Sequence, residues 1–191
     1  MSGEREQNPM QNAAVRADAR PDADLERVFR EHNRLVLRAA YRVTGSAQDA
    51  EDVLQTVFLR LARHEGWMQL SKTPAPYLHR AAINAALDIV RTRQAARASA
   101  LDEIEPILAT DAAESPDNVW AGVELRGFIR EALGRMSPRN AEIFSLRYFE
   151  GYGNHEIAKM LGTSRSTINV ILHRMRERLR EELGPILGGV R

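Results

Sequence analysis

The stretch from Asn154 to Arg180 constrains this chain most, because its pattern fits two helices joined by a tight turn. Apolar residues at helical spacing predict a short helix before Gly162 and a longer helix after it. Gly162 stands where a helix C-terminus favours positive φ, and Thr163 and Ser164 offer hydroxyls that can cap the second helix. The pattern predicts a helix-turn-helix, which places its second helix in the DNA major groove.

The outer face of that second helix is basic and rich in hydrogen-bonding groups. The guanidinium groups of Arg165 and Arg174 can reach guanine O6 and N7, and the Asn169 amide suits adenine N6 and N7. The hydroxyls of Ser166 and Thr167 lie beside the helix N-terminus, where they suit phosphate oxygens. These side chains form a candidate surface for reading duplex DNA.

Two alternatives to DNA reading stay open at this point. His173 either donates to a base or packs on the nucleic-acid backbone. The whole stretch could also be an ordinary helical hairpin whose arginines face solvent, since such hairpins are common.

The composition of the 191 residues predicts an all-α chain. Ala, Leu, Arg and Glu dominate, and β-branched runs with period-two alternation are scarce. Hydrophobic residues make up 43% of the chain but aromatic residues only 6%, which favours small helical cores. We therefore expect two small helical domains.

The sequence shows no pattern typical of a catalytic or metal site, and we expect a protein that binds and does not catalyse. The chain has no cysteine, its five histidines are scattered without metal-ligand spacing, and it has no glycine-rich phosphate loop. We expect no metal and no cofactor. No apolar run approaches the roughly 18 residues of a membrane span, and the N-terminus lacks a signal-peptide pattern. We expect no membrane insertion and a cytoplasmic location.

A sharp change in composition predicts the domain boundaries. Residues 99–118 hold six acids, two prolines and no Lys or Arg, which is typical of a flexible interdomain linker. The linker separates a first domain at 22–98 from a second at 119–184. We expect residues 1–21 to be a disordered lead-in and 185–191 to be a tail.

Three helices are expected in the first domain. The first runs from about residue 25 to Gly45, and His32–Asn33 is the point where it could break. The second begins at Ser46, with Asp49 completing a capping box. The third starts near Pro76 and is basic, which makes it a candidate phosphate-contacting surface, although its arginines could equally face solvent.

The second domain is expected to be a compact four-helix unit. One helix runs from about Trp120 to Met136. Ser137 and Pro138 then provide an N-cap and a first helical residue for the next helix, which ends near Gly151. The helix-turn-helix completes the unit.

Taken together, the chain resembles a bacterial sigma factor of the extracytoplasmic-function group within the sigma-70 family. Three blocks match in the right order: SAQDAEDVLQTVFLRL, YLHRAAINAALDIVRTR, and the stretch from LGRMSPRN to REEL. They resemble the family's polymerase-docking helix, its downstream-element reader and its upstream-element reader (region four). A short linker stands where larger members carry extra domains, as is typical of this group.

The resemblance implies binding to core RNA polymerase, promoter recognition, DNA melting and control by an anti-sigma factor. It places three groups of contacts on this chain: Asp49, Asp52 and Gln55 toward the polymerase; Tyr77, Arg80, Asn84, Asp88 and Arg91 toward the downstream element; Arg147 toward upstream phosphate. Two residues keep structural alternatives. Asp88 could pair with Arg91 or Arg80, and Arg147 with Glu150 or Glu156.

The sequence departs from the family pattern at three positions. Tyr77 stands where tryptophan is frequent, Gly153 replaces a capping serine, and Asn169 lies where relatives are often basic. We expect Asn154 to substitute as the cap and Asn169 to read a variant upstream element. The competing hypotheses are a free-standing helix-turn-helix regulator and a decoy that binds regulators without DNA.

Overall fold

The computed structural model describes residues 21–63, 74–100 and 116–187, and within them every regular element is a helix. This confirms the all-α prediction. In chain order the described helices are α2 (Pro21–Thr44), α3 (Ala47–Arg63), α5 (Pro74–Ala100), α6 (Pro116–Arg135), α7 (Pro138–Tyr148), α8 (Asn154–Met160) and α9 (Arg165–Leu187). No helix in these ranges is long and apolar enough to cross a membrane.

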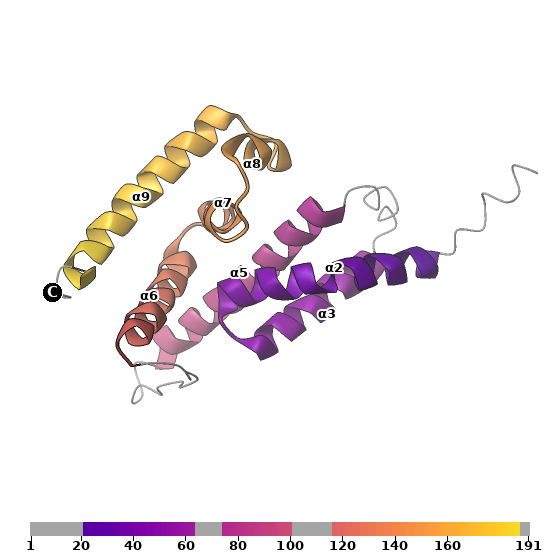
Figure 1. Ribbon diagram of the computed structural model, residues 1–191, viewed down its shortest axis with the longest axis horizontal. Helices are drawn as coiled ribbons and strands as arrows, with labels where there is room; N and C mark the ends of the chain where they lie inside the picture. The colour runs from indigo at the N-terminus through magenta and orange to yellow at the C-terminus, as the bar shows by residue number, and fades with distance from the viewer. Residues whose placement is uncertain (1–20, 64–73, 101–115, 188–191) are drawn as a thin grey trace, which may run out of the picture.

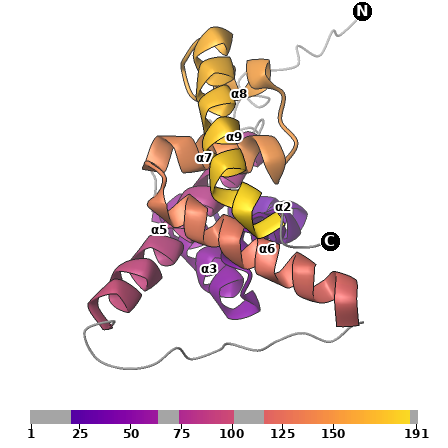
Figure 2. The same ribbon diagram turned by 90° about the vertical axis from the view of Figure 1, so that its left-hand side faces the viewer.

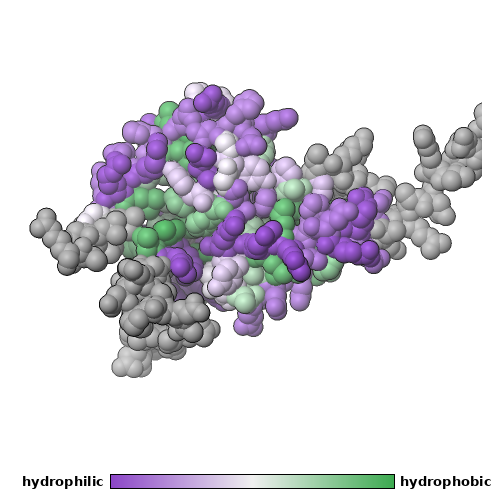
Figure 3. All heavy atoms as spheres, viewed as in Figure 1, coloured by the Kyte–Doolittle hydropathy of each residue, from purple (hydrophilic) through white to green (hydrophobic). Residues whose placement is uncertain are grey.

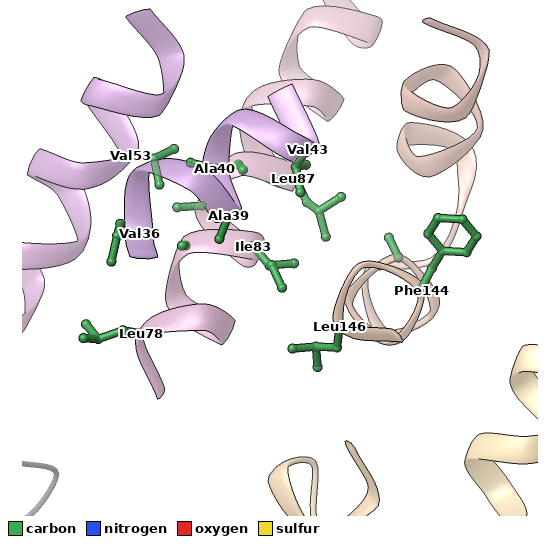
Figure 4. Close-up of a cluster of buried hydrophobic side chains, with 14 of the residues drawn as sticks. Val36, Ala39, Ala40, Val43, Val53, Leu78, Ile83, Leu87, Phe144 and Leu146 are labelled. Carbon is green, nitrogen blue, oxygen red and sulfur yellow. The ribbon is translucent and has the colours of Figure 1, made fainter. Parts of the chain in front are cut away.

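Helices α2, α3 and α5 pack on one another to form an N-terminal bundle (Figure 1). Its core is made of aliphatic side chains with almost no exposure, including Val36, Val53 and Ile83 (Figure 4). Helix α2 runs unbroken through His32–Asn33, so the break that the sequence allowed there is absent. Burial of one continuous apolar stripe against both partner helices stabilises the whole length of α2.

The C-terminal segment, α6 to α9, is arranged differently from the compact four-helix unit that we expected. Helices α7, α8 and α9 pack on one another, but α6 packs mainly on α5 of the N-terminal bundle. Helix α7 also packs on α5, and the two views show α8 and α9 standing beyond it (Figures 1 and 2). The two halves therefore share one buried cluster, to which Leu133 and Leu146 of the C-terminal segment contribute.

The turns follow the capping chemistry of the sequence. Gly45 and Gly162 have φ of 70° and 62°, as the helix ends require. The Ser137 hydroxyl accepts from the Asn140 N–H at 3.4 Å, and Pro138 begins α7. Ser164 caps α9 in the same way, because its Oγ accepts from the Thr167 N–H at 3.1 Å.

The predicted linker and ends lie largely outside the described residues. Helix α5 reaches Ala100 and α6 begins at Pro116, so both helices run into the expected linker at 99–118. The lead-in at 1–21 is described only at Pro21. Helix α9 continues to Leu187, past the expected end at Pro185.

Two glycine substitutions test how the turn of the helix-turn-helix is held. Gly162→Ala should lower the free energy of unfolding by about 1–2 kcal/mol, because alanine is strained at positive φ. A Cβ would meet nothing within 4 Å at either Gly162 or Gly127, so steric contact is excluded as the cause. Gly127 lies inside α6, and Gly127→Ala should raise stability by about 0.5–1 kcal/mol. Chemical denaturation of both variants measures the difference; a loss in both would contradict the explanation.

Candidate nucleic-acid interface

Helix α9 separates an apolar inner face from a polar outer face. Ile168, Leu172 and Met175 are buried against α7 and α8, as their spacing predicts. The predicted reading residues are all exposed: Arg165, Ser166, Thr167, Asn169, His173 and Arg174. Figure 3 shows hydrophilic side chains over α8 and α9 on the face in view. The geometry leaves one side of α9 available for a ligand.

Three hydroxyls cluster at the start of α9. Ser164 Oγ lies 2.7 Å from Ser166 Oγ and 2.8 Å from Thr167 Oγ1. All three residues are exposed, so each hydroxyl can still turn toward a ligand. Together with the N–H groups of the first helical turn, they offer donors to an anionic oxygen.

Asn154 has a different role from the capping role that we expected. The N-terminus of α8 is closed by Glu156, whose Oε2 accepts from the Gly153 N–H at 2.7 Å. Asn154 is the first residue of α8, and its Nδ2 donates to Asn169 Oδ1 on α9 at 2.6 Å. Glu156 supplies only the reciprocal half of a capping box, since it accepts from the Gly153 N–H, and Asn154 makes no cap but holds the amide of a predicted reading residue.

Arg147 is exposed at the end of α7 and donates to the Tyr152 backbone carbonyl at 3.2 Å. The alternative ion pairs with Glu150 or Glu156 are absent, because Glu150 binds the N-terminal bundle and Glu156 caps α8. Arg147 therefore supports the turn between α7 and α8, and part of its guanidinium faces solvent.

In the chain without DNA, two residues predicted to face the downstream element, Arg80 and Asn84, contact the C-terminal segment. Glu142 of α7 is buried at 4% exposure, and its Oε1 accepts from Arg80 Nε at 2.8 Å and from Asn84 Nδ2 at 3.2 Å. Arg80 Nη1 also donates to the Met160 carbonyl at 3.0 Å. A buried carboxylate needs such partners, since desolvation without them is costly.

A second buried carboxylate, that of Glu150, joins the C-terminal segment to the N-terminal bundle. Glu150 Oε2 lies 3.1 Å from Arg42 Nη1 and 3.1 Å from His79 Nε2. Burial raises the pKa of Glu150, but the hydrogen bond and charge of His79, together with Arg42, outweigh it and lower the pKa below its usual value. His79 Nδ1 also bonds the Tyr152 hydroxyl at 2.6 Å. Burial, then the nearby charge of Glu150, raises the pKa of Tyr152.

The other predicted downstream residues, Tyr77, Asp88 and Arg91, make separate contacts along α5. Asp88 pairs with Arg91 at 3.4 Å, which is the structural alternative that the sequence left open, yet its side chain remains 69% exposed. A groove of about 400 Å³ between α3 and α5 is lined by Asp88 together with Thr56, Arg60, Thr92 and Arg93. Tyr77 is half-buried at the start of α5. Asn84 and Asp88 share a face of α5 by their i,i+4 spacing, and of the two only Asn84 bonds Glu142 of α7.

The three predicted polymerase contacts separate into one buried and two exposed residues. Both carboxylate oxygens of Asp49 bond the Arg93 guanidinium, one of them at 2.6 Å to Nη2, and Asp49 is only 4% exposed. The Asp49 N–H also bonds Ser46 Oγ at 3.3 Å, which is half of the expected capping box. Asp52 and Gln55 are exposed on α3. Only these two present side chains to a partner.

Sequence reasoning missed the residues that join the two halves: Arg42, His79, Glu142 and Glu150. Their pairings span 58 to 108 residues of sequence, so no helical spacing could indicate them. No cluster of three or more His, Asp or Glu side chains able to hold a metal occurs in the described part of the chain.

Comparison with known proteins identifies two conserved regions on this scaffold. Residues 28–96 match the family model of sigma-70 region 2, and residues 129–179 match that of sigma-70 region 4. The chain is 32% identical to the ECF RNA polymerase sigma factor SigE of Mycolicibacterium smegmatis over 168 residues, covering 83% of this chain but 61% of that protein. It is 31% identical to the ECF RNA polymerase sigma factor SigL of Mycobacterium tuberculosis, over 90% of this chain and 98% of that protein. It is 32% identical to the RNA polymerase sigma factor CarQ of Myxococcus xanthus, over 88% of this chain and 94% of that protein.

Paired substitutions test whether Asp49 serves the fold. Asp49→Asn should lower the free energy of unfolding by about 1–2 kcal/mol, because it removes a charge-assisted pair from a buried carboxylate while Arg93 stays half in water. Asp52→Asn removes the same charge three residues further along α3 and should leave stability within about 0.5 kcal/mol. Thermal and chemical unfolding measure the stability of both variants. Equal stabilities of Asp49→Asn and Asp52→Asn would show that the ion pair of Asp49 with Arg93 contributes nothing to the fold.

Proposed function

We propose a division of labour for this chain, which belongs to the extracytoplasmic-function group of the sigma-70 family and is an RNA polymerase sigma factor. Exposed residues of α3, Asp52 and Gln55, bind core RNA polymerase in the cytoplasm. Helix α5 reads and opens the downstream promoter element through Tyr77, Arg80, Asn84, Asp88 and Arg91. Helix α9 reads the upstream element. The chain acts through binding, and an anti-sigma factor holds it inactive.

The outer face of α9 is the observation that carries this proposal. Its exposed Arg165, Asn169 and Arg174 offer the donors and acceptors that suit base edges in the major groove. Ile168 and Leu172 on the opposite face are fully engaged in packing, so the helix orientation is fixed. The hydroxyls of Ser166 and Thr167, with Arg147 and His173, would then contact the DNA backbone.

A free-standing helix-turn-helix regulator is not favoured. Residues 28–96, which form most of the N-terminal bundle, match sigma-70 region 2, and a free-standing regulator would not need this region. The exposed Arg165, Asn169 and Arg174 also argue against a decoy that has lost its DNA-reading residues.

Transcription with purified core RNA polymerase tests the proposal. Added chain should convert the core enzyme from non-specific to promoter-directed initiation, with start sites mapped on genomic DNA fragments. Arg174→Ala should keep binding to the core enzyme, yet lose about 1–3 kcal/mol at one upstream base pair. Absence of any complex with core polymerase would exclude the proposal. Equal weakening on every promoter sequence would make Arg174 a phosphate contact.

Asn154 should position the amide of Asn169 for base reading. Its hydrogen bond uses one lone pair of Asn169 Oδ1, so the second lone pair and the Nδ2 donors remain for adenine N6 and N7. Asn169→Ala should cost about 1–3 kcal/mol of discrimination at one upstream base pair. Asn154→Ala should cost about 1 kcal/mol at that same base pair.

Promoter binding by the holoenzyme to duplexes with single base-pair changes measures both effects. The double variant should lose no more selectivity than Asn169→Ala alone, because Asn154 acts through Asn169. Additive losses, or a loss at a different base pair, would show that Asn154 does not position Asn169. His155→Ala, at the exposed neighbouring position, serves as the matched control.

A further inference from the structure

We propose that Val170 reads the C5 methyl group of a thymine in the upstream promoter element, close to the bases that Asn169 and Arg174 contact. It is an apolar specificity determinant on a surface whose other reading residues are polar. The inference deepens the proposed function and rests on it, since it requires α9 to lie in the major groove.

The side chain of Val170 is 49% exposed, unlike the apolar residues that hold α9 in place. Ile168, Leu172 and Met175 are buried at 5% exposure or less, and Ile171 packs partly against the same core. Valine is also a poorer helix former than alanine, because its branched Cβ loses side-chain freedom in a helix. Val170 therefore contributes little to the stability of α9, and its exposed side is free for a ligand.

Val170 lies in the middle of the predicted reading surface. Ser166 precedes it by four residues, and His173 and Arg174 follow it by three and four, so these side chains share one side of the helix. Asn169 is its immediate neighbour, and each of the four is exposed. A single exposed apolar residue needs no explanation on an ordinary surface. Here it is surrounded by groups that suit base edges and phosphates, so a ligand that meets them also meets the valine.

The first turns of α9, which carry Val170, project from the rest of the molecule. Val170 is the sixth residue of the helix, about 8 Å from its start at 1.5 Å per residue. Both views show this end of α9 beside α8 and beyond α7, away from the N-terminal bundle (Figures 1 and 2). A recognition helix contacts base edges through its N-terminal residues, so Val170 lies in the part that enters the groove.

The chemistry of the major groove selects the base that an isopropyl group can read. The C5 methyl of thymine is the apolar group that the bases present there. Against another base edge, Val170 would cover a donor or an acceptor and remove its water without offering a partner, which costs free energy. Burial of one methyl group against Val170 should strengthen binding about fourfold, from the transfer free energy of a methylene-sized group.

The position of this thymine follows from the spacing along α9. Val170 and Arg174 are four residues apart, which is about 6 Å along the helix axis. Successive base pairs are about 3.4 Å apart. We therefore expect the thymine within about two base pairs of the one that Arg174→Ala affects.

Replacement of thymine by uracil tests the inference, because uracil lacks only the methyl group and keeps the same donors and acceptors. The holoenzyme, made of the full chain and core RNA polymerase, is titrated with duplexes that carry the upstream element of a mapped promoter. One thymine at a time is changed to uracil on either strand. We expect one change to weaken wild-type binding about fourfold. Val170→Ala should bind the thymine duplex about fourfold more weakly and should not distinguish it from that uracil duplex.

Leu125→Ala is the matched control, because Leu125 is also an exposed aliphatic residue, at 37% exposure, and lies on α6. This variant should keep the fourfold preference for thymine. Circular dichroism melting checks the fold of both variants. Alanine is the better helix former, so Val170→Ala should be no less stable than the wild type.

Three results would overturn the inference. The wild-type holoenzyme could bind every uracil duplex as tightly as the thymine duplex. The uracil effect could have the same size in Val170→Ala as in the wild type. Val170→Ala could also lose affinity for core polymerase itself, which would make the valine a protein contact.

Arg174→Ala on the same duplexes separates this inference from the proposed function. Loss of selectivity at one base pair in Arg174→Ala, without any uracil effect, would overturn the role of Val170 and leave the sigma-factor function intact. A holoenzyme that fails to initiate from any promoter would overturn the proposed function and this inference with it.

Discussion

The carboxylate of Glu142 is the constraint on which the arrangement of the two halves depends. It lies on α7 among fully buried neighbours, and a charge in that position must be paired and hydrogen-bonded. Its own helix offers only Arg139, 3.7 Å away through the other oxygen. The short contacts come from Arg80 and Asn84, so pairing of Glu142 brings α7 onto α5.

Helix α5 consequently packs against four neighbouring helices along its length. It packs on α2 and α3 to build the N-terminal bundle, and it receives α6 and α7 from the C-terminal segment. Toward its end, Arg93 holds Asp49 of α3, and Gln94 Nε2 donates to the Glu131 carbonyl at 2.8 Å. The basic character of this helix thus has a structural use in the free chain. The same helix carries Arg80 and Asn84, two of the donors that the proposed function assigns to DNA.

The sequence predicts the local elements well because their determinants are local. The apolar spacing of α9, the Ser137–Pro138 start of α7 and the positive φ of Gly162 all follow from neighbouring residues. The exposed outer face of α9 was predicted for the same reason: a helix whose one side is apolar must present the other to solvent.

Contacts between distant segments could not be predicted in this way. Asp49 looks like a surface acid by its spacing, yet Arg93, forty-four positions later, buries it. Asn84 and Asp88 share a helix face by spacing, but α7 covers only Asn84, and Asp88 stays exposed beside α3. Asn154 looks like a cap for α8, yet its side chain bonds Asn169 of α9. In each case the residue that determines the contact lies on another helix.

The distance between the two halves tests the account most directly. The chain has no cysteine, so spin labels can be attached through Arg34→Cys on α2 and Arg176→Cys on α9, both exposed positions. Pulsed electron resonance on the free chain should give one narrow distance distribution, because the contacts of Glu142 and Glu150 hold the two halves together. A broad distribution that stays the same in Glu142→Gln and Glu150→Gln would contradict an arrangement that depends on these two carboxylates.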